Sequence, residues 1–349
     1  MRKILLSLLI VSIGMSIGSC STTSTPSPVS EPLATDPPSI PSTTPPTLDQ
    51  ISVPTDTLEP TPSPVPPTAT PTPKPICNGP EDPLTILVVG TDYRYLNYLY
   101  GMADSIMIMR VDYVTGEVAL MGIPRGLWVE IPDVEEDNGR THGKITQAYF
   151  FGTKGMGYYS GSGFGAGLLK ETIRHNYGVE IDKHIVVSME AFTYIINDLG
   201  GIKIYNPYPV YSYQESEPKY EIGGYVFSGY DALMYARYRD PRNSLDRIDR
   251  QAIIMEAVYD EVFSLSVIPA IPKLIGKRKE TVLTDLTLVE ISQLACMAAK
   301  TDPDQVVFTR IPKDLLYIPD WEGSPWAEKE PGSLSQVLRD FFEGIYPEH

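Results

Sequence analysis

Apolar and polar positions alternate in short blocks from about residue 84 onwards, and the blocks predict strands separated by helices. Continuous apolar runs at 85–90, 105–111 and 117–123 are typical of buried strands. A turn at 113–116 separates the second run from the third, so we expect a hairpin there. Strand patterns follow at 184–188, 202–205, 281–284 and 306–311, and helical patterns at 145–151, 168–176, 190–199, 230–236, 246–263, 288–300 and 335–342.

This alternation of strands and helices predicts the α/β class with a mixed central sheet. Two segments break the pattern. The segment 152–167 holds seven glycines and few large aliphatic side chains, so we expect a mobile loop. A Tyr- and Pro-rich excursion without a predicted element follows the strand at 202–205 and continues to about residue 222.

The N-terminus has the pattern of a targeting segment. Arg2 and Lys3 precede an apolar stretch, 4–17, that is too short to cross a bilayer comfortably as a helix. The stretch ends in small residues and Cys20, which resembles a bacterial lipobox. We therefore expect residues 1–20 to be a lipoprotein signal peptide ending at a lipidated Cys20. An ordinary signal peptide or a short membrane anchor with an incidental cysteine is the alternative.

Residues 21–75 have a different composition from the rest of the chain. They hold 17 of the 33 prolines, mixed with Ser and Thr, and no aromatic residue. Such a segment cannot bury a core and is expected to be a disordered, extended tether. A spacer that only provides slack is compatible with the same composition.

Charge and cysteine content narrow the function classes. The formal net charge is −16, whereas a nucleic-acid-binding protein is expected to be basic, so we expect no nucleic-acid partner. With Cys20 assigned to a lipid, Cys77 and Cys296 remain. In an oxidising compartment they could form one disulfide. Two unpaired thiols are the alternative.

Five arginines lie between residues 237 and 250 of this acidic chain. Guanidinium groups stay charged and offer planar donors matched to phosphate, so the stretch predicts an anion site. Pairing with neighbouring aspartates would absorb one or two of the five. Spacing puts Arg247, Arg250 and Gln251 on one face of the helix predicted at 246–263, and Ile254 extends that face into the core. The five are Arg237, Arg239, Arg242, Arg247 and Arg250.

Two carboxylates come at neighbouring strand ends. Asp92 follows the strand at 85–90, where ligands bind in α/β sheets, and Asp104 precedes the next strand. They could share a hard cation through oxygen ligands, and Mg²⁺ held by few carboxylates usually needs substrate phosphates as well. A turn-capping role is the alternative for Asp92. Arg125 follows the third strand and Lys144 precedes the helix at 145–151, and each alone reads as a surface charge.

Several motifs in chain order carry a resemblance to a known family. They are GTDYR, ADS, GIPR, HGKITQAY, INDLGGIKI, GYDALMYARYR and DRIDRQ, and the last two together form its most specific element. From about Leu84 to Ile311 the chain resembles the LytR–CpsA–Psr family, also called the cell envelope-related transcriptional attenuator domain. The resemblance implies a single α/β/α domain with a hydrophobic groove for a polyprenyl chain, at 76–320. The helices predicted at 168–176 and 190–199 are candidates to line that groove. Residues 321–349 would be a C-terminal extension with a final helix.

The resemblance also implies a function on the outer face of the cytoplasmic membrane, with the protein held there by its lipid anchor. The family transfers a glycopolymer from a polyprenyl-pyrophosphate carrier to peptidoglycan, and a Mg²⁺-dependent phosphotransferase is therefore expected, with Mn²⁺ as a possible substitute. A pyrophosphatase acting on the carrier and a non-catalytic polyprenyl-phosphate-binding protein are the alternatives. By the same similarity, Asp92, Asp104, Arg125 and Arg239 would be catalytic, Asp92 and Asp104 would bind the metal, and the pyrophosphate would be bound by Arg94, Arg125, Arg237, Arg239, Arg247 and Gln251, with Lys144 nearby.

The chain departs from the family pattern at four places. Gly126 stands where the family usually has Asp, and Met102 lies in a position near which it often has Arg. Thr146 replaces Asn in the family's Lys-Ile-Asn, and Ser244 replaces an acid before the helix arginine. The metal pair and most of the arginines are retained, so we expect a divergent but active member.

Overall fold

The computed structural model of the chain describes residues 74–93, 98–132, 134, 142–211, 216–238, 246–264, 282–319 and 325–347. All of them belong to one compact unit, 69–349. The signal segment with Cys20 and almost all of the predicted tether lie outside the described residues. Among the helices that the structure describes, none combines the length and the apolar character needed to cross a membrane.

A six-stranded sheet with the order β11-β6-β1-β2-β3-β12 forms the centre of the unit. β1 pairs parallel to β6 and antiparallel to β2, β2 pairs antiparallel to β3, β3 pairs parallel to β12, and β11 pairs antiparallel to β6. The predicted mixed sheet and the hairpin between the second and third strands are thus confirmed. The strands are β1 (Leu84–Thr91), β2 (Ala103–Val111), β3 (Val118–Gly122), β6 (Lys183–Ser188), β11 (Val282–Thr284) and β12 (Val306–Arg310).

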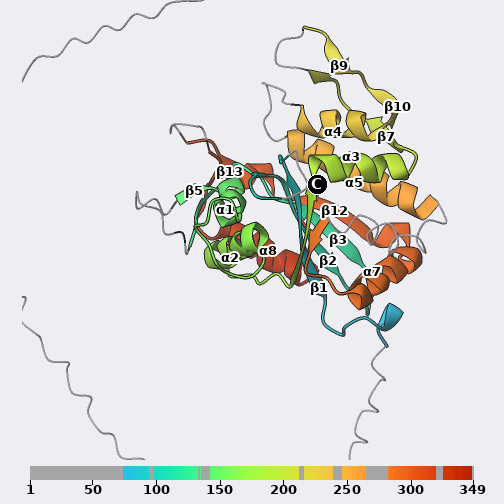
Figure 1. The fold of residues 1–349 in the computed structure, drawn as a ribbon. Coiled ribbons are helices and arrows are strands. Elements are labelled where there is room, and N and C mark those ends of the chain that lie inside the picture. Colours follow the sequence, from blue (N-terminus) through green and yellow to red (C-terminus); the bar gives the residue numbers. More distant parts are fainter. Residues whose placement is uncertain are drawn as a thin grey trace, which may run out of the picture. The chain divides into compact units, whose positions relative to one another are not determined.

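Helices cover both faces of this sheet, which gives three layers (Figure 1). On one face, β1 and β2 contribute Leu87 and Ile108 to a core with Leu168 of α2 and Leu338 of α8. Apolar side chains on both sides explain why the strands read as continuous apolar runs. One face carries α1 (Ile145–Gly152), α2 (Phe164–Tyr177) and α8 (Ser333–Phe342), and the other carries α3 (Met189–Asp198), α4 (Gly229–Arg237), α5 (Asp246–Ser264) and α7 (Leu288–Lys300).

The prediction of a loop through residue 167 is wrong at its end, because α2 already begins at Phe164. The glycines there serve close packing between helices. A Cβ on Gly165 would lie 2.8 Å from the carbonyl oxygen of Tyr149 in α1, and a Cβ on Gly152 would lie 2.8 Å from Cβ of Leu168. The glycine content therefore predicted a loop where two helices are in close contact.

Short strands were missed in the irregular segments. β4 (Trp128–Glu130) pairs with β5 (His142–Lys144), and neither was predicted. The strand predicted at 202–205 is confirmed as β7 (Ile202–Asn206), but its partner β10 (Gly223–Phe227) was missed. The Tyr- and Pro-rich excursion contains β8 (Val210–Tyr211) and β9 (Pro218–Tyr220), and β13 (Leu316–Tyr317) pairs with β14 (Ala327–Glu328). Three 3₁₀ turns complete the described elements: η1 (Ile76–Asn78), η3 (Pro303–Gln305) and η4 (Lys313–Leu315).

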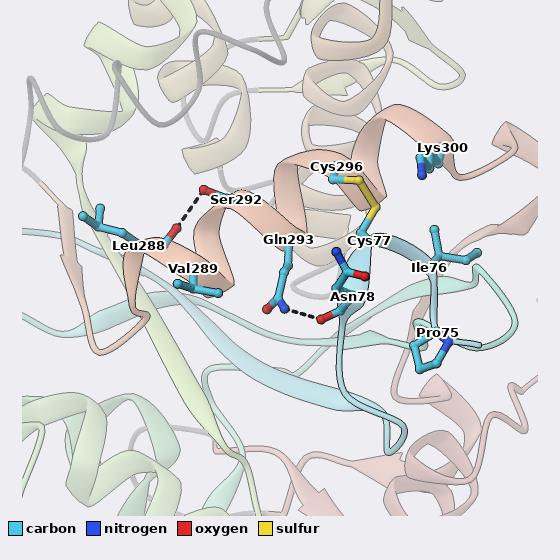
Figure 2. Close-up of a pocket in the computed structure, with 10 residues that line it drawn as sticks. All are labelled: Pro75, Ile76, Cys77, Asn78, Leu288, Val289, Ser292, Gln293, Cys296 and Lys300. Atoms are coloured by element: carbon cyan, nitrogen blue, oxygen red, sulfur yellow. Dashed lines mark hydrogen bonds between the residues drawn. A yellow bond between two sulfur atoms is a disulfide. The ribbon is translucent and has the colours of Figure 1, made fainter.

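Cys77 and Cys296 form a disulfide, with their Cα atoms 5.8 Å apart, which decides between the two alternatives left open by the sequence. The bond joins η1, ahead of β1, to α7 (Figure 2). A hollow of about 1140 Å³ surrounds it. Lys300 is the one charged residue among those that line this hollow.

Candidate active site

A pocket of about 320 Å³ lies between the central sheet and helices α3, α4 and α5. Most of its wall is apolar and comes from both the sheet and the helices. Polar groups enter from the strand and helix ends. The apolar lining comprises Val88, Val89, Met107, Met109, Leu120, Ile185, Val187, Met189, Phe192, Ile195, Ile196, Leu233, Ala236, Ile254, Met255 and Val258.

The polar lining gathers at one end of the pocket because of the topology. Thr91 and Ser188 end the parallel strands β1 and β6, and β2 runs the opposite way and so begins at this same edge. Arg237 ends α4, and Arg247 and Gln251 lie in the first two turns of α5. The result is an apolar slot whose one end carries the charged groups of Asp104, Arg237 and Arg247 and the neutral amide of Gln251.

A β-bulge turns Asp104 toward this pocket. Neighbouring side chains on a regular strand point to opposite faces, yet Asp104 and Ser105 both line the pocket. The pairing of β1 with β2 shifts register between Gly90 and Thr91, opposite these two residues. A bulge re-aims side chains in this way and is common beside active sites.

Asp104 holds two arginines with its two carboxylate oxygens. Nη1 of Arg125 donates to Oδ1, and Nη2 of Arg247 lies 2.9 Å from Oδ2. Only 16% of the Asp104 side chain is exposed. Burial raises the pKa of this carboxyl, but the charges and hydrogen bonds of Arg247 and Arg125 outweigh it and lower the pKa below its usual value. Asp104 is therefore an anion that fixes guanidinium groups.

The arginines of the 237–250 stretch divide by role. Arg237 lines the pocket, and no hydrogen bond or ion pair joins its guanidinium to another described residue. Arg250 is buried and donates to the carbonyl oxygens of Tyr235 and Tyr238, at the C-terminal end of α4. It therefore ties α5 to α4 and does not line the pocket. Arg239 and Arg242 lie outside the described residues.

Neighbouring aspartates were expected to pair with some of these arginines, but Asp249 pairs with other residues. Its carboxylate binds Arg310, at the end of β12, and Lys313, whose Nζ lies 3.0 Å from Oδ2. Asp249 lies two residues after Arg247 on α5 and thus on another side of the helix. Asp249 therefore does not pair with Arg247, which binds Asp104 instead.

Asp92 directly follows β1, as the sequence predicted. Its Oδ1 accepts the backbone N–H of Met102 at 2.7 Å, and the N–H of Asp92 donates to the carbonyl of Met102 at 3.1 Å. The turn-capping alternative is thus part of its role. Oδ2 has no partner among the described residues, so one oxygen is left for a ligand. Met102 itself contributes backbone groups here where the family often has an arginine nearby.

The donor set at this edge suits a hard cation. Asp92 and Asp104 lie on either side of the Thr91–Ala103 pair of neighbouring strands and offer carboxylate oxygens. Mg²⁺ prefers oxygen ligands and is commonly held by one or two carboxylates plus substrate phosphates. Within the described residues no group of three or more His, Cys, Asp or Glu side chains could hold a metal. Both oxygens of Asp104 already contact arginines, and Asp92 has one oxygen without a partner among the described residues. The pair therefore suits a cation that takes most of its ligands from a phosphate group.

The remaining predicted site residues lie around the pocket or outside the residues that the structure describes. Arg125 reaches the site through Asp104 but is not part of the pocket lining, and Lys144, in β5 opposite Trp128, is not part of it either. Gln251 lines the pocket and donates from Nε2 to the carbonyl of Asp104 at 3.3 Å. Arg94 and Ser244 lie outside the described residues.

Two predicted helices, 168–176 and 190–199, were candidates to line the apolar slot, and the first prediction is wrong. α2 buries Leu168, Leu169 and Ile173 in the core on the opposite face of the sheet. α3 does line the pocket, through Phe192 and Ile195 among others. The contribution of α4 and α5 was missed, although the continuation of the Arg247 face to Ile254 was its signal in the sequence.

The departure at Gly126 has a packing reason. A Cβ at this position would lie 3.1 Å from Cδ1 of Trp326, and the carbonyl of Gly126 accepts the N–H of Trp326 at 2.8 Å. The C-terminal segment thus covers the place where the family usually has an aspartate. A larger residue there would displace the Trp326 ring.

Comparison with known proteins points to the same family as the motifs. The model of the LytR_cpsA_psr family matches residues 66–330. A curated relative, the polyisoprenyl-teichoic acid–peptidoglycan teichoic acid transferase TagU of Halalkalibacterium halodurans, is 30% identical over 211 residues. The match takes in 60% of this chain and 62% of the relative, so this chain spans less than two thirds of the relative's length.

Solved structures share the fold. The crystal structure of B. subtilis TagV has a TM-score of 0.59 at 23% identity and covers 77% of this chain and 100% of that chain. A structure described as TagT bound to LIIa-WTA has a TM-score of 0.55 at 19% identity and covers 76% of this chain and 91% of that chain. At these identities the likeness establishes the fold alone.

Proposed function

The chain belongs to the LytR_cpsA_psr family, and from this membership and the geometry of the pocket we propose that it is a phosphotransferase. It moves a glycopolymer from a polyprenyl-pyrophosphate carrier to peptidoglycan. The observation that carries the proposal is a pocket with two parts of different character. Its walls, from α3, α4, α5 and the sheet, are apolar, and one end carries Arg237 and Arg247. A lipid with an anionic head and an apolar tail matches both ends. The relative TagU, named as a teichoic acid transferase, supports the reaction class.

The reaction joins the glycan phosphate to an acceptor hydroxyl. The oxygen of the hydroxyl attacks the phosphorus next to the glycan, the bond from that phosphorus to the bridging oxygen breaks, and polyprenyl monophosphate leaves. The proton of the hydroxyl passes to a base. Phosphoryl transfer depends mainly on positioning and on neutralising charge at the phosphate oxygens, and the arginines supply both.

Each site residue has a part in that proposal. Arg237 and Arg247 bind the pyrophosphate, and Arg94 and Arg239, outside the described residues, are proposed to assist them. Asp104 fixes Arg125 and Arg247, and its lowered pKa makes it a poor proton acceptor. Gln251 and Lys144 support the same region.

We propose Mg²⁺ as the cofactor, with Asp92 and Asp104 as the residues that would hold it. When bound, the ion would neutralise charge on the pyrophosphate oxygens. The support is the donor chemistry: carboxylate oxygens at adjacent strand ends, one of them without a partner among the described residues. Binding of Mn²⁺ to the full chain, followed by paramagnetic broadening, should be lost in Asp92→Asn whether or not the enzyme turns over.

We propose that the protein acts outside the cytoplasm, held to the membrane by a lipid on Cys20. The disulfide between Cys77 and Cys296 supports an oxidising compartment. Labelling cells with a radioactive fatty acid tests the anchor. The wild-type protein should be labelled and Cys20→Ser should not, and equal labelling of both would refute it.

The reaction itself is tested with the full chain in detergent, a polyprenyl-pyrophosphate-linked glycan, Mg²⁺ and peptidoglycan fragments. Covalent glycan on the acceptor is expected. Phosphate release without transfer would instead support a pyrophosphatase, and tight binding with neither would support a binding protein. Asp92→Ala and Arg239→Ala should each abolish turnover, and full activity in both would refute the assigned site.

The apolar slot is tested separately. Ala236 of α4 lines the pocket, so Ala236→Trp should fill it and raise KM for the lipid substrate about tenfold or more. Ala299→Trp is the matched control, because Ala299 is exposed on α7 and away from the pocket lining. Equal KM values for the two variants would show that the lipid chain binds elsewhere.

A further inference from the structure

Thr146 contacts the backbone on both sides of the Asp104–Arg125 ion pair. It is the second residue of α1 and only 4% exposed. Its N–H donates to the carbonyl of Arg125 at 3.2 Å. Its Oγ1 donates to the carbonyl of Ala103 at 2.8 Å, and Ala103 immediately precedes Asp104. One buried residue thus joins the two segments that carry the ion pair, with its backbone N–H on one side and its hydroxyl on the other.

The start of α1 explains why these bonds form. The first N–H groups of a helix have no partner inside the helix. Here Ile145 donates to the carbonyl of Leu127 at 2.7 Å and Thr146 to that of Arg125, so the helix end holds the segment that follows β3. A hydroxyl near a helix start commonly caps the helix itself, but the Thr146 hydroxyl crosses to β2 instead.

The peptide groups around Asp104 are held from two directions. Thr146 binds the carbonyl before Asp104, and Gln251 binds the carbonyl of Asp104 itself at 3.3 Å. The β-bulge in this part of β2 lacks the regular ladder that would otherwise fix its backbone. These two side chains therefore replace ladder contacts where the carboxylate must be aimed.

We infer that Thr146 is a positioning residue of the transferase site. It fixes the angle at which Asp104 presents Arg125 and Arg247 to the pyrophosphate. Thr146 does not line the pocket, so it acts through these residues and not on the substrate. The inference rests on the proposed function for its effect on rate. It also assigns a role to one of the positions at which this chain departs from the family pattern.

The test compares variants that keep or lose the hydroxyl in the full chain. Thr146→Val has nearly the same shape but leaves the buried Ala103 carbonyl without a donor. We expect kcat to fall 10- to 100-fold while KM for the lipid substrate changes less than threefold. Thr146→Ser should keep at least a third of the wild-type kcat. If Thr146→Val does not fold, Thr146→Ala makes the same comparison.

Thr172→Val is the matched control. Thr172 is fully buried in α2, and its Oγ1 donates to the carbonyl of Leu168 at 2.8 Å, on the opposite face of the sheet from the pocket. It should keep wild-type kcat. Equal loss of kcat in Thr146→Val and Thr172→Val, or no loss in Thr146→Val, would overturn the inference.

A double-mutant cycle separates this inference from the proposed function. If Thr146 acts through Asp104, Thr146→Val should destabilise the Asp104→Asn protein less than it destabilises the wild type. The fold-reduction of the folding equilibrium constant should be at least five times smaller in the Asp104→Asn background. This measurement by urea unfolding needs no turnover. A wild-type protein without transferase activity would refute the proposed function, and the cycle would then still decide on Thr146. Additive effects in the cycle would overturn the positioning role.

Discussion

Arg247 and Asp104 form an ion pair in which Nη2 lies 2.9 Å from Oδ2, and the pair links the start of α5 to the start of β2. The side chains are only 10% and 16% exposed. The same contact closes the charged end of the pocket and holds two elements of the fold together. Changes at this pair are therefore expected to affect binding and stability at once.

Arg247→Met should lower the free energy of unfolding by about 3 kcal/mol at pH 7, because it leaves a buried carboxylate with one partner fewer. The pKa of Asp104 is lowered in the folded state, so the pair stabilises the fold above the ordinary carboxyl pKa of about 4 and loses that effect as the pH falls through the lowered pKa. The difference in stability between pH 7 and pH 3 should thus be smaller in the variant.

Urea unfolding at the two pH values measures this difference. Arg174→Met is the control, since the Arg174 side chain is 53% exposed and pairs with Glu171 within α2. Its loss should be within about 0.5 kcal/mol. A pH dependence of Arg247→Met identical to that of the wild type would contradict the prediction.

Asp285 provides a second, separate pH effect. Burial raises its pKa, but hydrogen bonds and charge from His184, with a further contribution from Lys170, lower it to about 2. Its stabilising effect is present above pH 4 and is lost as the pH falls toward 2. Because the side chain is 37% exposed, solvent screening limits the effect to about 1 kcal/mol.

Asp285→Asn should therefore lose about 1 kcal/mol at pH 7 and show a flatter stability curve between pH 4 and 2. Acid unfolding followed by circular dichroism gives the curve. Asp304→Asn, at an exposed position of η3, should leave the curve unchanged. Parallel curves for wild type and Asp285→Asn would show that the His184 contact does not lower this pKa.

The disulfide should contribute substantially to stability, because it closes a loop across a sequence separation of 219 residues. The double variant Cys77→Ser/Cys296→Ser should lose about 2–5 kcal/mol in urea unfolding. Reductant should destabilise the wild type by a similar amount and leave the double variant unaffected. A wild-type protein with the same unfolding midpoint with and without reductant would argue against the prediction.

Gly122 sets the distance between β3 and α5. A Cβ there would lie 2.7 Å from Cγ2 of Ile248, in the turn of α5 that carries Arg247. Gly122→Ala should cost about 1–3 kcal/mol through overpacking and, by displacing α5, should weaken binding of the proposed lipid substrate. In the Ile248→Ala background the same change should cost less than about 0.5 kcal/mol, because the clash is gone.

Gly224→Ala is the control for the effect of adding a methyl group to a strand glycine. Gly224 lies in β10 with no atom within 4 Å of a built Cβ and no positive φ. Differential scanning calorimetry compares the wild type with Gly122→Ala, Ile248→Ala, the double variant and Gly224→Ala. If Gly122→Ala and Gly224→Ala cost the same, the close approach of β3 and α5 has no energetic consequence.

The order of elements could be predicted from the sequence, because buried strands and amphipathic helices have local periodicities. The position of Asp92 after β1 followed from the same local pattern. The pairing of Asp104 with Arg125 and Arg247 could not be predicted, since it depends on a β-bulge and on how α5 docks over the sheet. Helical spacing also grouped Arg250 with Arg247, and only the approach of α4 separates their roles.

Long-range packing could likewise not be predicted from the sequence. The choice between α2 and α3 for the pocket depends on which face of the sheet each helix covers, and both helices have buried apolar residues. The glycines before and within α2 looked like a loop because a close helix contact and a flexible segment have the same composition.

The disulfide has a mechanical consequence. Cys77 stands where the N-terminal segment enters the described fold, and it is bonded both to the backbone leading into β1 and, through sulfur, to α7. A pull on the N-terminal segment would therefore be divided between two load paths. Part of the tension would enter α7, and the strand that ends at Asp92 would bear correspondingly less. A domain tethered at this end could thus be pulled without shifting Asp92, the residue proposed to bind the metal, relative to the neighbouring strand.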